Sequence, residues 1–187
     1  MSPRLKSISY VVLRWLLGAL FIFSGVVKCV DPIGTSIFVD KYLATYSMGW
    51  LMPISESLAV GLSVFEFTLG VLLVSGVWRR FTALITVVVL LLFSVVTLLS
   101  ATILPIGDCG CFGDALKLSP WATFLKNIVM LPFAITIWRI SDRCHSVKLR
   151  DFIIFAVAIS LPLLVNIYAL KHLPLVDFLP YKAGTNI

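Results

Sequence analysis

Five long apolar segments, separated by polar stretches, set the pattern of the chain. They lie at residues 8–28, 54–77, 81–104, 120–138 and 152–170. Each has about 20 residues, the length that an α-helix needs to cross a hydrocarbon core of about 30 Å. The pattern predicts a single transmembrane domain over residues 1–187, an all-α integral membrane protein with about five transmembrane helices. We expect four of them to form an antiparallel bundle, with the fifth, C-terminal helix packed beside it.

Three longer polar stretches separate or follow these segments, at residues 29–53, 105–119 and 171–187. The first is bracketed by Pro32 and Pro53, and proline begins or ends helices. Its aromatic side chains, such as Tyr42 and Tyr46, are typical of a membrane–water interface. We therefore expect a loop with a short helix on the membrane surface in this stretch.

Composition also indicates a membrane protein. Hydrophobic residues make up 60% of the chain and charged residues 13%, and the mean hydropathy is +1.06. A soluble domain has about 25% charged residues. The net charge of +6 does not indicate nucleic-acid binding, because the basic residues gather at the ends of apolar segments. Membrane lipids are the partners that such residues contact.

The charges differ between the two ends of the predicted bundle. One end carries Arg4, Lys6, Arg79, Arg80, Arg139, Arg143, Lys148 and Arg150. The other end carries Lys28, Lys41, Lys117, Lys171 and Lys182, diluted by Asp31, Asp40, Asp108, Asp114 and Asp177. The positive-inside rule places the N-terminus in the cytoplasm, and the 105–119 loop and the C-terminal tail on the outer side. In a bacterium this describes an inner-membrane protein with the loop in the periplasm, where disulfide chemistry is normal.

The loop that follows the third apolar segment holds Cys109 and Cys111, separated by Gly110. The Cα atoms of two cysteines at this spacing are close enough for a disulfide, but only near the edge of the usual distance range. Gly110 between them can adopt positive φ and so relieves strain in the small disulfide ring. Such a bond closes almost no loop and so stabilises little, whereas a strained, exposed disulfide exchanges readily. The pair is therefore the candidate catalytic site, with thiol–disulfide exchange as its chemistry. Its candidate supporting residues are Asp108, Gly110, Phe112, Gly113 and Asp114.

Two other interpretations of the cysteine pair stay open. With Asp108, Asp114 or His172 it could bind a soft metal such as Cu(I), which thiolates select. One C-x-C pair supplies too few ligands for a structural zinc site, so no metal site is assigned. In the second interpretation the two cysteines only pack within the loop.

Polar residues inside the predicted helices form a second candidate site, made of Lys28, Glu66, Lys126 and Asn127. An ionisable residue in a membrane span usually faces the bundle interior and has a partner. We expect Glu66 to pair with Lys126 or Lys28 beneath the cysteine loop. Its role is either a proton path or quinone headgroup site, or a structural ion pair that fixes helix register. Asn127 and Asn166 are expected to form hydrogen bonds between helices.

Two single residues are further candidates, Cys29 and His172. Cys29 lies near a segment end, where a cysteine is usually a small hydrophobe, but it is also the only candidate relay on the outer side. Cys144 is predicted on the opposite side. His172 could donate a proton to a thiol. Since the chain has no second close cysteine pair, we expect it to depend on a partner.

The segment D-C-G-C-F-G-D at 108–114, followed by Trp121 and Lys126-Asn127, resembles the MauE/DoxX family of redox-associated membrane proteins. Further resembling pieces are residues 23–28, 31–34 and Glu66-Phe67. The tail is similar to the form found in Bacteroidetes. It carries Asn166, Tyr168, His172-Leu173-Pro174, Asp177-Phe178, Pro180-Tyr181-Lys182 and Gly184. Cys29 is not part of the family pattern.

The resemblance implies a helical protein of the cytoplasmic membrane. MauE members are linked to methylamine utilisation, with disulfide formation or maturation of an amine dehydrogenase as their expected role, and DoxX members to a quinone-linked oxidase. We therefore expect thiol–disulfide electron transfer with a periplasmic or membrane redox partner, with quinone as the candidate cofactor. The alternatives are a non-catalytic assembly subunit of an oxidoreductase and copper handling. Whether the chain is an enzyme by itself stays open.

Overall fold

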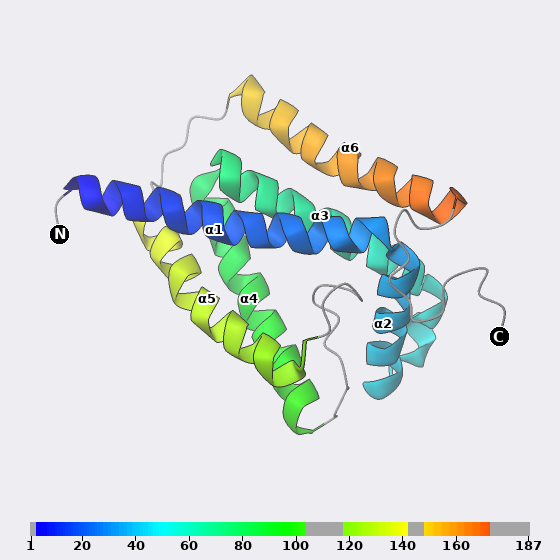
Figure 1. Ribbon diagram of the computed structural model, residues 1–187. Helices are drawn as coiled ribbons and strands as arrows, with labels where there is room; N and C mark the ends of the chain where they lie inside the picture. The colour runs from blue at the N-terminus through cyan, green and yellow to red at the C-terminus, as the bar shows by residue number, and fades with distance from the viewer. Residues whose placement is uncertain (1–2, 104–117, 142–147, 173–187) are drawn as a thin grey trace.

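The computed structural model describes residues 3–103, 118–141 and 148–172, and every regular element in these ranges is a helix (Figure 1). The helices are α1 (Pro3–Val30), α2 (Pro32–Thr45), the short 3₁₀ helix η1 (Gly49–Ile54), α3 (Ser55–Ser75), α4 (Arg79–Thr102), α5 (Pro120–Ile140) and α6 (Leu149–His172). Within the described ranges, five helical segments are long and apolar enough to cross a membrane. The prediction of an all-α membrane protein is confirmed.

The membrane-length helices are arranged as two pairs with α6 on the outside. Helix α1 packs against α3, and α4 packs against α5, while α6 contacts α3 and α1 (Figure 1). The four-helix bundle with a fifth helix beside it is therefore present. The α4–α5 pair diverges from α1 toward the end where α2 lies (Figure 1). Helix α2 packs on α3, and a cleft lies between α2 and α4.

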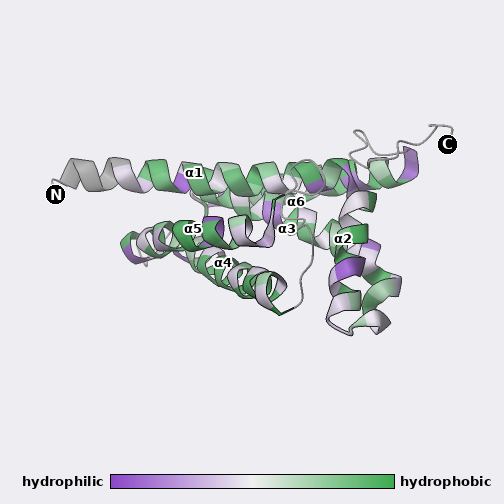
Figure 2. Cartoon of the chain, turned by 60° about the horizontal axis from the view of Figure 1, so that its bottom comes forward, coloured by the Kyte–Doolittle hydropathy of each residue, from purple (hydrophilic) through white to green (hydrophobic). Residues whose placement is uncertain are grey.

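The outer surface of the bundle is largely apolar, as a lipid-facing surface should be. Figure 2 shows hydrophobic residues over most of α1, α4 and α5. Large side chains such as Leu92, Leu125 and Leu164 are exposed on this surface. In water such a surface would promote aggregation. In a bilayer it is the surface that contacts the lipid chains.

Helix α2 begins with a specific cap. The Asp31 carboxylate accepts a hydrogen bond from the backbone N–H of Gly34 at 2.8 Å, and Pro32 occupies the first helical turn. Both features favour a helix start. This cap turns the chain sharply from α1 into α2 (Figure 1). The short helix expected between the first two spans is thus present.

Glycines allow α1 and α3 to approach closely. A Cβ atom at Gly70 would lie 2.6 Å from the backbone nitrogen of Ile22, and one at Gly25 would lie 2.6 Å from the backbone nitrogen of Phe67. Small residues let membrane helices pack backbone to backbone. This contact brings the side chains of α1 within hydrogen-bond distance of Glu66 on α3.

We expect Gly70→Ala to destabilise the protein by about 1–3 kcal/mol, because the added methyl group overpacks the α1–α3 contact. Gly61 on the same helix is the matched control, since a Cβ there meets nothing within 4 Å. Gly61→Ala should be neutral or stabilising by up to about 1 kcal/mol, the helix propensity of alanine over glycine. Reversible unfolding in mixed micelles measures both. Equal losses in the two variants would contradict the close contact.

Candidate functional site

The predicted catalytic cysteines, Cys109 and Cys111, lie outside the described residues, as does the rest of their supporting loop. The helices that flank this connection are described. Helix α4 ends at Thr102, and α5 begins at Pro120, after Ser119 has capped it by accepting a hydrogen bond from the N–H of Ala122 at 3.2 Å. Both of these helix ends lie at the end of the bundle opposite the N-terminus (Figure 1).

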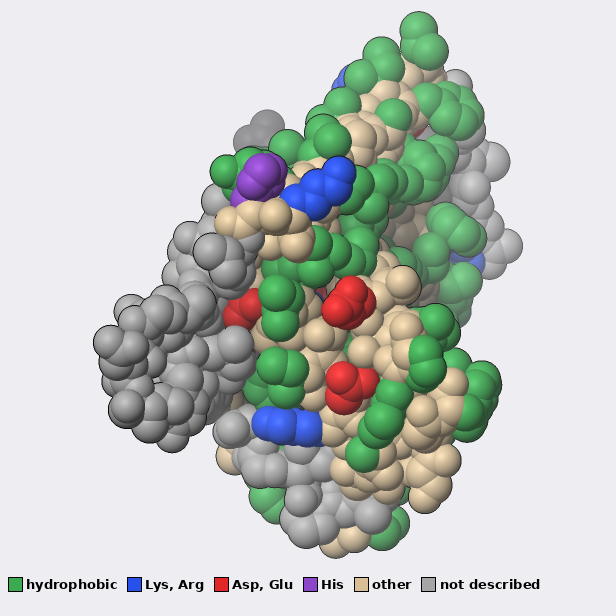
Figure 3. Space-filling model, turned by 90° about the vertical axis from the view of Figure 1, so that its right-hand side faces the viewer, with side chains coloured by type: hydrophobic (Ala, Val, Ile, Leu, Met, Phe, Trp, Pro, Cys, Tyr) green, Lys and Arg blue, Asp and Glu red, His purple; other side chains and the backbone are tan. Residues whose placement is uncertain are grey.

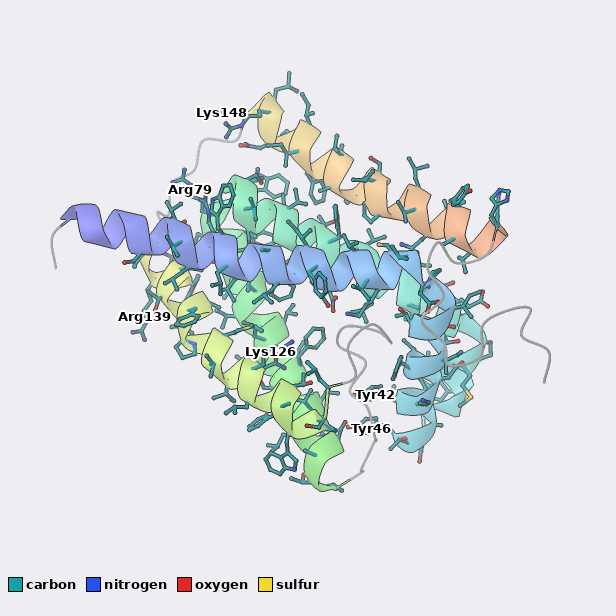
Figure 4. The ribbon with its side chains drawn as sticks, in the orientation of Figure 1. Tyr42, Tyr46, Arg79, Lys126, Arg139 and Lys148 are labelled. Carbon is teal, nitrogen blue, oxygen red and sulfur yellow. The ribbon has the colours of Figure 1, made fainter. Side chains whose placement is uncertain are left out.

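The described basic residues of the other end lie together. Figure 4 shows Arg79, Arg139 and Lys148 at the same end of the bundle as the N-terminus. Arg80 is nearby in sequence and stacks on Trp138, with its guanidinium carbon 5.7 Å from the ring centroid. We call this end of the molecule the basic end. On the opposite end, shown in Figure 3, acidic and basic side chains are interspersed among apolar ones.

A buried ion pair joins α1 to α3. Lys28 Nζ lies 2.6 Å from Glu66 Oε2, and both side chains are 2% exposed. Ser24, one turn before Lys28, donates to the same carboxylate oxygen at 2.6 Å, and its hydroxyl oxygen accepts a hydrogen bond from Lys28 at 2.7 Å. Buried charges need such a partner and further hydrogen bonds. Two lysines were expected as possible partners for Glu66, and in the structure the ion pair forms with Lys28.

We call Ser24, Lys28 and Glu66 the polar triad. Sequence reasoning had selected Lys28 and Glu66 but had missed Ser24. The available signal was spacing, because residues i and i+4 of a helix share a face, so Ser24 had to accompany Lys28.

A small cavity lies on one side of Glu66. It has a volume of about 30 Å³ and is lined by Ser24, Glu66, Lys126, Asn127 and apolar side chains. This is room for about one or two water molecules. The structure thus brings Lys126 and Asn127 of α5 to the polar triad, as Figure 4 illustrates for the position of Lys126 on α5.

Asn127 differs from expectation. Its side chain is 2% exposed, and its amide nitrogen has no hydrogen-bond partner in the part of the chain that the structure describes. This nitrogen does not make the expected interhelical hydrogen bond within the described residues, although Asn127 lines the small cavity together with Glu66. Asn166, by contrast, makes the expected interhelical bond, donating to Ser63 Oγ at 3.0 Å.

A larger cleft lies on another side of the triad, between α2 and α4. Its volume is about 310 Å³, and Lys28 and Glu66 form part of its wall. The remaining lining is mostly apolar and aromatic. It comprises Thr35, Phe38, Val39, Tyr42, Leu43, Tyr46, Met48, Leu62, Phe93, Val96 and Thr97.

Tyr42 of α2 and Tyr46, the residue that follows the end of this helix, form one wall of the cleft. Figure 4 shows Tyr42 and Tyr46 extending from α2 toward the space beside α4. Their rings are stacked, with centroids 6.3 Å apart and planes inclined by 9°, and the Tyr46 hydroxyl lies 3.5 Å from Ser100 Oγ on α4. The sequence had predicted interfacial positions for them. The signal missed was the i, i+4, i+8 spacing of Phe38, Tyr42 and Tyr46, which puts three rings on one helix face.

The two single candidates lie away from the cleft lining. Cys29 is 3% exposed and faces α6, where its sulfur accepts a hydrogen bond from the Asn166 amide at 3.2 Å. It packs as a buried free thiol. His172, the last residue of α6, is exposed, and its ring centroid lies 4.8 Å from that of Tyr168. Within the described residues, no three His, Cys, Asp or Glu side chains form a cluster that could hold a metal.

Five membrane-length helices around a buried ion pair define a multi-pass helical membrane protein. The family model of methylamine utilisation protein MauE matches residues 6–139. The chain therefore belongs to the MauE family, and the match covers α1 through most of α5.

One curated relative is Protein TlpB of Flavobacterium psychrophilum, 24% identical over 179 residues. The match covers 93% of this chain and 45% of the relative, so the chain spans about half the length of this relative. No solved structure matches the chain.

Proposed function

We propose that the protein is a thiol–disulfide redox protein of the bacterial inner membrane, with Cys109 and Cys111 as the exchanging pair. The observation that carries the proposal is the C-x-C pair in the α4–α5 connection of a MauE family member. The pair cannot stabilise the fold appreciably, because its disulfide closes almost no loop. Its spacing instead favours a strained bond that exchanges readily.

The distribution of charge supports an outward position for the pair. The basic end carries Arg79, Arg80, Arg139 and Lys148, and α4 and α5 meet the cysteine connection at the opposite end. The positive-inside rule assigns the basic end to the cytoplasm. The connection then faces the periplasm, where an oxidising milieu maintains disulfides.

The reaction is a two-electron exchange. A thiolate of the reduced partner attacks one sulfur of the Cys109–Cys111 disulfide, and a mixed disulfide forms while the other sulfur leaves as a thiolate. The second thiol of the partner then attacks the mixed disulfide. The partner leaves with a new disulfide, and this chain keeps two thiols, so two electrons and two protons have moved.

A non-catalytic subunit that supports the maturation of a partner oxidoreductase is the second candidate. The observation that favours it is the cysteine inventory. The chain holds four cysteines, and only Cys109 and Cys111 are close in sequence, so no second close pair is available to pass electrons onward. Cys29 is buried against Asn166 rather than exposed for exchange.

The redox titration of the pair in membranes tests the proposal. We expect Cys109 and Cys111 to titrate together as a two-electron couple, with a midpoint potential above about −300 mV, as labile disulfides do. Alkylation of free thiols after equilibration in glutathione buffers measures the reduced fraction. A Cys29→Ser, Cys144→Ser background confines the signal to the pair. A pair that stays reduced at every potential and binds Cu(I) tightly would show metal handling instead.

A further inference from the structure

A second large cleft lies between α3, α4 and α6, and we call it the α6 groove. Its volume is about 600 Å³, and large apolar side chains form most of its walls, among them Phe65 of α3, Phe81 of α4 and Phe155 of α6. The residues of α3 that line it run from Ser57 to Leu72, a distance of about 22 Å along the helix. One leaflet of a bilayer contributes about 15 Å of hydrocarbon. The groove is therefore long enough for an acyl chain of one leaflet.

The volume of the α6 groove also limits what can lie in it. A helix with its side chains is at least about 10 Å across, so ten residues of it occupy about 1,200 Å³. The groove has about half of this volume. It can hold a flexible hydrocarbon chain, but not a further helix.

The interior of the α6 groove favours an apolar occupant. Two threonines, Thr68 and Thr82, belong to its wall, and both hydroxyl groups already have acceptors. Thr68 Oγ1 donates a hydrogen bond to the carbonyl oxygen of Ala158 at 3.0 Å, and Thr82 Oγ1 donates one to that of Val77 at 2.9 Å. A polar group placed there would lose its hydration and gain no donor from these side chains. A hydrocarbon chain loses nothing of this kind.

One mouth of the α6 groove lies at the basic end. Trp78, which lines the groove, contacts the start of α6, with its ring centroid 6.0 Å from that of Phe152 and 5.3 Å from that of Phe155. Arg79 directly follows Trp78, Lys148 directly precedes α6, and Figure 4 shows both cations at this end. Both are exposed, and within the described residues neither side chain forms a salt bridge or hydrogen bond. The mouth thus presents two cations that are available to an anion.

Helical spacing separates the cations that face the groove from those that do not. Lys148 shares a face with Phe155 and Ile159, at positions i, i+7 and i+11, and these two apolar residues line the groove. Arg150 lies on the opposite face of α6 by the same spacing. Arg80 stacks on an aromatic ring of α5 and so points away from the groove.

We propose that the α6 groove binds one anionic phospholipid from the leaflet at the basic end. An acyl chain lies in the groove, and the phosphate lies against Lys148 and Arg79. Basic pockets between membrane helices suit such headgroups. The carboxylate in the first turn of α6, Asp151, is 0% exposed and accepts a hydrogen bond from the backbone N–H of Lys148 at 3.0 Å, so it is not at the surface that the headgroup approaches. Binding involves no redox step and does not depend on the proposed thiol–disulfide function.

Direct binding tests the choice of headgroup. The probes are phosphatidylglycerol, which is anionic, and phosphatidylcholine with the same acyl chains, which is zwitterionic. Native mass spectrometry of the whole chain, released from micelles that contain either lipid, counts the bound molecules and gives their affinities. One phosphatidylglycerol should bind saturably, and at least fivefold more tightly than phosphatidylcholine. Equal affinities, or the absence of saturable binding, would overturn the site.

Four charge variants locate the headgroup. Arg79→Gln and Lys148→Gln should each weaken phosphatidylglycerol binding about fivefold, the change that corresponds to about 1 kcal/mol for one basic residue near an anionic headgroup. Arg80→Gln and Arg150→Gln are the matched controls, because they remove the same charge at the same end of the molecule but away from the groove. They should change the affinity less than about twofold. Equal losses in all four variants would mean that the basic end attracts anionic lipid without a defined site, and would overturn the proposal.

The position of the acyl chain has its own test. Ile159→Trp should weaken phosphatidylglycerol binding at least fivefold, because Ile159 lines the groove and the indole would take up part of its volume. Val157→Trp is the matched control, since this side chain is 55% exposed and is not among the residues that line the groove. Equal affinity in the two variants would overturn the acyl-chain position. If a second copy of the chain occupies the groove instead, Ile159→Trp would convert a dimer into a monomer without changing the lipid affinity, and this result would also overturn the proposal.

Discussion

Replacing Cys109 and Cys111 by serine is expected to reduce thiol–disulfide exchange to the background of protein-free membranes. A serine hydroxyl forms no disulfide, so neither the mixed disulfide nor the internal one can exist. The fold should be unaffected, because the pair lies in the connection after α4 and its bond closes almost no loop. Oxidation of a reduced test dithiol by the chain in proteoliposomes measures the loss, and reversible unfolding in micelles checks stability.

Single substitutions make the same prediction more specific. The single thiolate that remains in Cys109→Ser or Cys111→Ser can attack the disulfide of an oxidised partner, and the other partner sulfur leaves as a thiolate. This chain then has no second thiol at the pair to release the mixed disulfide, so either variant should trap a covalent complex when the partner is supplied oxidised. Cys29→Ser is the matched control, because this thiol is 3% exposed and its sulfur accepts a hydrogen bond from the Asn166 amide. If the double variant still supports maturation of the partner, the chain acts as an assembly subunit. If Cys29→Ser abolishes turnover, the buried thiol relays electrons.

The helical fold could be predicted from the sequence because membrane helices are encoded locally. Each needs about 20 consecutive apolar residues, and each must satisfy its own backbone hydrogen bonds. Five such segments are readable without knowledge of their neighbours. The short helix α2 was also predictable, because Asp31-Pro32 is a local start signal.

The ion pair was only half predictable. A carboxylate inside a span requires a partner, and this indicated that Glu66 pairs with a lysine. The choice between Lys28 and Lys126 depends on which helix lies against α3. That contact is set by the close approach at Gly25 and Gly70, which is a property of two helices together. A single apolar segment carries no signal for it.

The cleft was not predictable from the sequence. Tyr42 and Tyr46 have the composition of interfacial residues, and their actual surroundings depend on the angle at which α2 leaves α1. The Asn127 amide nitrogen has no hydrogen-bond partner within the described residues, and this likewise depends on how α5 packs in the bundle. Both features arise from tertiary packing, and they lie beside the triad that the sequence did indicate.

Breaking the ion pair on one side should cost more stability than any other substitution described above. Lys28→Met leaves the Glu66 carboxylate buried, with Ser24 as its remaining hydrogen-bond donor within the described residues. Removing one member of a buried pair typically costs about 3–5 kcal/mol. Glu66→Leu should also destabilise the protein, because it removes the carboxylate that both Lys28 and Ser24 contact. Reversible unfolding in mixed micelles measures both losses.

The double variant Lys28→Met, Glu66→Leu shows whether the two charges stabilise the fold mainly through each other. If the charges stabilise mainly each other, the double variant should lose far less than the sum of the single losses, since a well-packed apolar replacement of a buried pair is often neutral. A loss equal to the sum would show that the two residues act independently. A small loss in the double variant would fit the geometry, because the close glycine contacts already hold α1 to α3 where the pair joins the two helices.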